Sequence, residues 1–181
     1  YPNQLSGGQQ QMVAIARSIK KVNDWIVLLC AACPNLEKAC ELAGIKYANE
    51  VFLDKKSKEK LEHLLEKILY EEFVDGLPMN IYCHHMTIAY NNHSEESQQI
   101  YNRYKGEFGL ERKIIATHIG ISRDAIAVRV SYDGDIINKI PHITLAVPIG
   151  GKPVNSNYIK EWRMLKSPII LTGILGEFVR H

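Results

Sequence analysis

The pattern of apolar and polar positions differs between the first and second parts of the chain. An unbroken apolar run over 25–33 predicts a strand buried on both faces. A short helix over 36–43 and a weaker strand over 47–53 are predicted next. Residues 57–73 give the clearest helical signal, because apolar side chains recur there on one helical face: Leu61, Leu64, Leu65, Ile68 and Leu69.

After Gly76-Leu77-Pro78 the pattern of apolar and polar residues becomes typical of a sheet with short connections. The predicted strands cover 81–90, 113–121, 125–132 and 140–147, with a last one from 168, and helices are predicted over 94–105 and 157–165. The order β-α-β-β-β-α-β predicts an α+β sheet domain. We therefore expect three regions: residues 1–21, an α/β-like segment over 22–78, and a domain over 79–181.

The first region resembles the signature motif of ABC-transporter ATPases. Leu5-Ser6-Gly7-Gly8-Gln9 matches that family's LSGGQ loop, and an alanine-rich helix is predicted to follow. The sequence contains no GxxxxGK[ST] phosphate loop, so we do not expect this chain to hydrolyse ATP on its own. We expect a structural helix, or a remnant or fusion of an ABC-type sequence. The alternative is an interaction segment that keeps the signature function in a larger dimer.

Composition places the chain among ordinary globular proteins, with 46% hydrophobic and 23% charged residues. A net charge of +2 is too small to predict nucleic-acid binding from the electrostatic field alone. The cysteines, Cys30, Cys33, Cys40 and Cys83, lack the second Cys or His pair of a zinc site and predict reduced, buried thiols. The absence of a secretory signal or a membrane-length apolar run predicts a cytoplasmic protein without membrane association.

Two strands carry the same chemistry. His85-Met86-Thr87-Ile88-Ala89-Tyr90 repeats as His142-Ile143-Thr144-Leu145-Ala146-Val147, with identities at the first, third and fifth positions. Side chains alternate between the faces of a strand, so His, Thr and Ala are predicted to share one face in each copy. The same alternation predicts that Tyr90 and His84 point to the opposite face.

Paired imidazoles and hydroxyls suit the cleavage of a phosphodiester without a metal or cofactor. A histidine pKa near 6.5 allows one ring to accept a proton while the other donates one. Two threonine hydroxyls can donate hydrogen bonds to the non-bridging oxygens of the phosphate. We therefore predict that both copies face one cleft from neighbouring strands.

These residues resemble the 2H phosphoesterases, a family named for two H-x-[ST] motifs in a two-lobed α+β fold of antiparallel sheets with flanking helices. The resemblance covers roughly 79–181, and two expectations stay open for residues 22–78: they supply part of the family's first lobe, or they replace it. It implies that His85 and His142 are catalytic, that Thr87 and Thr144 bind phosphate, and that no metal is needed. It also implies hydrolysis of a nucleotide or RNA phosphodiester, with a 2′,3′-cyclic phosphate at an RNA end as the expected substrate.

Other side chains near the motifs are candidates for substrate binding. Lys152, in a glycine-flanked loop, is suited to a phosphate, and three aromatic residues are suited to stacking on a base: Tyr90, Tyr158 and Trp162. Two alternatives stay open at this point. One is a nucleotide-binding module without turnover, and the other is an enzyme that degrades 2′,5′-oligoadenylate or cyclic oligonucleotides. The oligomeric state is also open.

Overall fold

The computed structural model describes residues 46–72, 78–90 and 94–180. The ABC-like segment, the predicted strand over 25–33, the helix over 36–43 and three of the four cysteines lie outside the described residues, as do Gly76-Leu77 and the turn predicted at 91–92. None of the helices in the described part is both long enough and apolar enough to cross a membrane.

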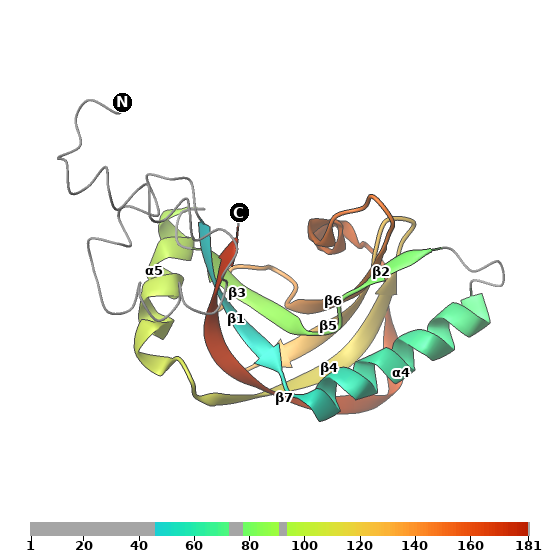
Figure 1. Ribbon diagram of the computed structural model, residues 1–181, viewed down its shortest axis with the longest axis horizontal. Coiled ribbons are helices and arrows are strands. Elements are labelled where there is room, and N and C mark those ends of the chain that lie inside the picture. The colour runs from blue at the N-terminus through green and yellow to red at the C-terminus, as the bar shows by residue number, and fades with distance from the viewer. Residues whose placement is uncertain (1–45, 73–77, 91–93, 181) are drawn as a thin grey trace.

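A strongly curled antiparallel sheet organises the described chain (Figure 1). Its seven strands follow the spatial order β2-β6-β5-β4-β7-β1-β3. They are β1 (Lys46–Leu53), β2 (Met79–Ile81), β3 (His85–Tyr90), β4 (Glu111–Ile121), β5 (Ile126–Tyr132), β6 (His142–Pro148) and β7 (Trp162–Arg180). The remaining elements are the helices α4 (Lys55–Glu72) and α5 (Glu95–Tyr104) and the 3₁₀ turns η3 (Lys105–Glu107) and η4 (Pro153–Tyr158). The predicted α+β class is confirmed.

Strand β7 joins two parts of this sheet. Its residues 162–174 pair with β4, whereas residues 173–180 pair with β1, so the ladder passes from one neighbour to the other around Gly173. A Cβ atom on Gly173 would lie 2.5 Å from the backbone oxygen of Phe52. The close approach of β1 at this junction therefore requires glycine.

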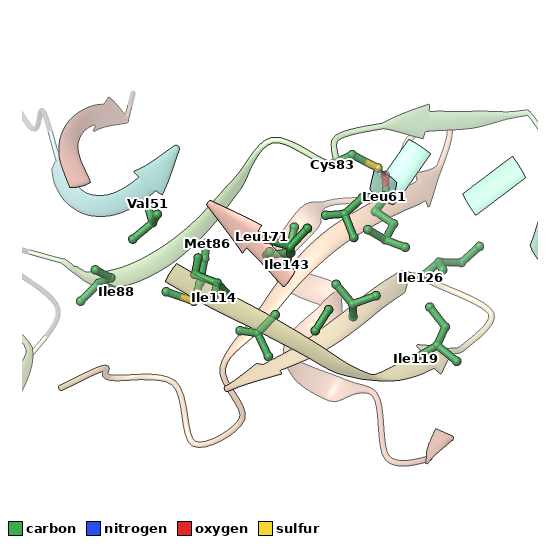
Figure 2. Close-up of a cluster of buried hydrophobic side chains, with 14 of the residues drawn as sticks. Val51, Leu61, Cys83, Met86, Ile88, Ile114, Ile119, Ile126, Ile143 and Leu171 are labelled. Atoms are coloured by element: carbon green, nitrogen blue, oxygen red, sulfur yellow. Dashed lines mark hydrogen bonds between the residues drawn. The ribbon is translucent and has the colours of Figure 1, made fainter. Parts of the chain in front are cut away.

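The curl encloses the hydrophobic core (Figure 2). Alternate residues of the strands point into it, among them Met86, Ile114, Ile143 and Leu171, all fully buried. Helices α4 and α5 add Leu61, Leu65, Ile100 and Tyr101 to the same cluster. The predicted leucine stripe of α4 is thus the face that packs on the sheet.

Helix boundaries follow capping chemistry. The Asp54 carboxylate accepts the backbone N–H of Ser57 at 2.7 Å at the start of α4, and hydrogen bonds from Ser57 lower the pKa of Asp54. Ser94 caps α5, because its hydroxyl accepts the N–H of Ser97 at 3.1 Å. Both helices therefore begin close to the positions that their sequences predict.

Two predicted elements are wrong in detail. The helix predicted over 157–165 is replaced by η4, which begins at Pro153, and by the start of β7. Trp162 pairs there with Gly120, whose missing side chain makes room for the indole, so tertiary pairing overrides the local helical preference. The strand predicted over 81–90 is broken at 82–84, where Cys83 adopts a left-handed φ of 54°.

Strand β1 lies inside the sheet, between β7 and β3. Its residues 46–53 therefore share one sheet with the strands of 79–180, although helix α4 separates them in sequence. This position gives β1 direct contact with the first His-x-Thr strand, which it pairs along its length.

Candidate active site

The two His-x-Thr strands, β3 and β6, meet because the sheet curls. The prediction that they are neighbouring strands of the sheet is wrong. Strand β3 occupies one edge of the sheet, and β6 lies next to the other edge. The segment between β2 and β3 nevertheless lies along β6: the N–H groups of Tyr82 and Cys83 donate to the carbonyls of Leu145 and Thr144 at 2.8 and 3.1 Å. Strands β3 and β6 are in direct contact as a result.

One small pocket of about 50 Å³ is lined by both copies of the motif. His85, Thr87, His142 and Thr144 all contribute to its wall, as the shared register of the two copies predicts. Its other lining residues are Tyr90, Asn138, Pro153, Val154 and Asn157. Two imidazoles and two hydroxyls from distant segments thus converge on a space that opens to solvent.

A β-bulge follows the His-x-Thr in each copy, at the same position of the repeat. In β3, Thr87 and Ala89 pair with consecutive residues of β1 and leave Ile88 as the extra residue. In β6, Thr144 and Ala146 pair with consecutive residues of β5 and leave Leu145 extra. Both extra residues are fully buried.

The orientations predicted for Ala89 and Tyr90 are wrong because of the bulge in β3. Because it shifts the alternation by one residue, Ala89 turns into the core and Tyr90 turns onto the face of His85 and Thr87. Tyr90, which a regular strand would place on the opposite face, therefore lines the pocket.

The imidazole of His142 is held in one tautomer. Its Nδ1 lies 2.8 Å from the carbonyl oxygen of Ile140, and a carbonyl can only accept, so Nδ1 carries the hydrogen. Nε2 is consequently the basic nitrogen of the neutral ring. Burial lowers the pKa of His142 below its ordinary value of 6.5, although the hydrogen bond to Ile140 opposes that shift.

His85 has two close partners, one acidic and one basic. Its Nε2 lies 3.6 Å from the carboxylate of Glu50, which is 1% exposed. Its Nδ1 lies 2.8 Å from Nδ1 of His84, and the two rings are 4.5 Å apart. His84 was predicted to point to the other face, but the left-handed turn at Cys83 brings it beside His85.

Both threonine hydroxyls are anchored at the edge of the pocket. The hydroxyl of Thr144 lies 2.9 Å from that of Ser156, a buried residue of η4. Thr87 donates a long hydrogen bond of 3.5 Å to the Glu50 carboxylate. Both hydroxyls are therefore held at the pocket wall, and the single hydrogen of Thr87 must turn away from Glu50 before it can be donated to a ligand.

A second cavity of about 360 Å³ adjoins the pocket. The two share His142, Asn138 and Asn157, and the second is also lined by Trp162. Of the other candidate ligand residues, Lys152 immediately precedes η4 and Tyr158 is 73% exposed at its end; neither lines these two cavities.

Glu50, Asn138, Ser156 and Asn157 are site residues that the sequence interpretation missed. Only Glu50 gave a local signal, because Asn49-Glu50 interrupts an otherwise apolar strand. A buried charged residue in a strand needs a partner, so Glu50 marked a polar site, whereas Asn49 faces the other side and donates to the carbonyl of Tyr101.

Metal-ligating side chains do not cluster in the described part of the chain: no group of three or more His, Cys, Asp or Glu residues is placed to hold an ion. Cys83, the described cysteine, is a free thiol in the core. Burial raises its pKa to about 12, so the thiol is protonated near neutral pH.

Comparison with known proteins gives a fold relationship only. No protein-family model matches the chain, and no curated protein matches it by sequence. Among solved structures, the fold is similar to the crystal structure of a fungal RNA kinase, with a TM-score of 0.56 and 10% sequence identity. The similarity covers 99% of this chain and 60% of that one, so this chain spans less than two thirds of the kinase's length. At this identity the similarity shows a shared fold.

Proposed function

We propose that this protein hydrolyses a phosphodiester at an RNA or nucleotide end, with a 2′,3′-cyclic phosphate as the preferred substrate. The observation that carries the proposal is the convergence of His85, Thr87, His142 and Thr144 on one pocket. Four residues of the right chemistry, from segments that are distant in sequence, have no packing reason to meet at a solvent-filled space.

The reaction follows from the two imidazoles. One neutral ring takes a proton from water as the water oxygen bonds to phosphorus. The other ring is protonated at the start. As one of the two ester P–O bonds of the cyclic phosphate breaks, this second ring delivers its proton to the departing ribose oxygen. The threonine hydroxyls hold the non-bridging oxygens in line, and the product is a phosphomonoester.

The larger cavity supports a nucleotide rather than a small inorganic ester. A nucleotide with its phosphate beside His142 can place its base in the 360 Å³ space, which Trp162, Asn138 and Asn157 help to line. The RNA kinase with a similar fold acts on RNA, and this is consistent with the same class of substrate.

Turnover of an RNA oligonucleotide ending in a 2′,3′-cyclic phosphate, in excess EDTA, is the direct test. We expect conversion to a phosphomonoester end that gains one oxygen from ¹⁸O-labelled water. The same RNA incubated with His142→Gln protein, purified in parallel, controls for contaminating nuclease.

Two results would count against the proposal. One is tight binding of the RNA without turnover, which would favour a nucleotide-binding module. The other is turnover of 2′,5′-oligoadenylate or a cyclic dinucleotide at a higher kcat/KM than the cyclic-ended RNA, which would replace the preferred substrate.

Trp162→Ala should weaken substrate binding while leaving the acid–base pair in place. Stacking of a base on an aromatic ring contributes about 1–3 kcal/mol, so we expect KM to rise about 10–100-fold for the RNA substrate. Trp162→Phe keeps a ring and serves as the matched control. An unchanged KM in a folded Trp162→Ala variant would remove Trp162 from the site.

A further inference from the structure

Glu50 is the most deeply buried ionisable side chain beside the pocket. It lies on β1, where it pairs with Thr87 of β3, so its side chain shares the face of His85 and Thr87. Its carboxylate is 1% exposed and faces the imidazole of His85 at 3.6 Å. A carboxylate kept away from water is stabilised strongly by a neighbouring cation.

The second partner of His85 favours the same charge state. A cationic His85 carries a hydrogen on each ring nitrogen, and Nδ1 can then donate to Nδ1 of a neutral His84 at 2.8 Å. Such a bond favours the charged form of the donor ring. The facing Nδ1 atoms cannot both carry a hydrogen in this bond, so at most one of the two rings is cationic, and His85 is the ring that faces Glu50.

The distance to Glu50 is also informative. At 3.6 Å the contact is a Coulomb interaction rather than a hydrogen bond, so it does not fix the direction of the Nε2–H. Glu50 can hold the charge on His85 while the Nε2–H is delivered to a ligand oxygen in the pocket. His142 has a different setting, because its hydrogen-bond partner is the neutral carbonyl of Ile140.

We infer that Glu50 is a positioning residue that keeps His85 protonated, which makes His85 the general acid and His142 the general base. This assignment of roles rests on the proposed phosphodiesterase function. In the proposed reaction, Nε2 of His142 takes the proton from water and His85 gives its proton to the departing ribose oxygen. The carboxylate stays ionised throughout and accepts no proton, and the His85 cation becomes neutral as the P–O bond breaks.

The titratable groups around His85 come from three segments. Among the described residues they are Glu50 on β1, His84 directly before β3, Tyr90 at the end of β3, and His142 on β6 across the pocket. The side chains from η4 and from the loop before β6 that line the pocket are uncharged: Asn138, Pro153, Val154 and Asn157. Within the described part of the chain, Glu50 is thus the anionic group beside His85.

Glu50→Gln tests the inference, because it keeps the side-chain volume and removes the charge. An opposite charge within about 4–6 Å shifts a pKa by about 1–3 units, so the alkaline limb of the pH–rate profile should move about one unit or more to lower pH. The acidic limb, which reports deprotonation of His142, should not move. Glu177→Gln is the matched control, because Glu177 pairs with Asn49 and lies on the opposite face of the same sheet.

Imidazole ¹⁵N NMR of the full chain gives a readout that needs no turnover. In the unmodified protein, His85 should titrate at a higher pH than His142, and Glu50→Gln should lower the His85 titration while Glu177→Gln leaves it unchanged. Equal titration of His85 with and without Glu50, or a His142 that titrates above His85, would overturn the inference. If His85 shifts as expected but no cyclic phosphate is hydrolysed, the role of Glu50 is supported and the proposed function fails on its own.

Discussion

Replacement of either pocket histidine by alanine should lower kcat by about 10²–10⁴-fold, the usual contribution of positioned acid–base catalysis. Each ring lines the same pocket as the other, and neither threonine can transfer a proton at neutral pH in its place. The measurement is kcat for the cyclic-ended RNA with His85→Ala and His142→Ala, normalised to folded protein by circular dichroism. We expect little change in KM, because the hydroxyls and Trp162 remain.

The double variant provides a sharper outcome. Groups that act as one unit are not additive, so the double replacement should cost far less than the product of the two single losses. His63→Ala is the matched control, because His63 lies on the exposed side of α4 and contacts only the solvated Glu66 in the pairs observed there. Wild-type turnover in His142→Ala, or a requirement for a divalent ion, would rule out the two-histidine reaction.

Leu145→Ala should lower the free energy of unfolding by about 2–5 kcal/mol. Leu145 is the extra residue of the β6 bulge and is fully buried in the main core. Its truncation leaves a cavity beneath the strand that carries His142 and Thr144. Since small domains have a total stability of about 5–15 kcal/mol, this is a large fraction, measurable as a lower midpoint in urea with an unchanged m-value.

Ile149→Ala is the control for that measurement. Ile149 directly follows β6 but is 68% exposed, so its truncation should change stability by no more than about 0.5 kcal/mol. If Leu145→Ala were as mild as Ile149→Ala, the bulge residue would not be a structural anchor, and the packing beneath the pocket would have to be assigned to other residues.

The sequence predicted most of the elements because their signals are local. The leucine spacing of α4, the Ser94 cap of α5 and the alternation of β5 depend on residues a few positions apart. The His-x-Thr repeat was equally visible, because each copy occupies a single strand.

The face of Tyr90 could not be predicted, because it depends on one extra residue. A period of two places Tyr90 opposite Thr87, but the bulge at Ile88 reverses this. The amino-acid sequence of β3 does not indicate the bulge. It is set by the pairing of β3 with β1, and helix α4 and strand β2 lie between these two strands in the sequence.

Glu50 shows the same limit for the site. Its partner Thr87 lies 37 positions away, and the two meet only through the ladder between β1 and β3. A regular pattern assigns a residue to a face, whereas long-range pairing decides which faces meet. The curl that brings β3 to β6 is likewise decided by long-range pairing and not by a local pattern.

The position of β1 sets the order in which the pocket can form during synthesis. β1, the first described strand, is held between β3 and the final strand β7, which pairs with it as far as Arg180. Ribosomes add about 5–20 residues per second, so a nascent chain spends several seconds with Glu50 translated and its β7 neighbour still missing. Because contacts this distant in sequence also form slowly, the pocket is expected to be completed only after β7 has left the ribosome.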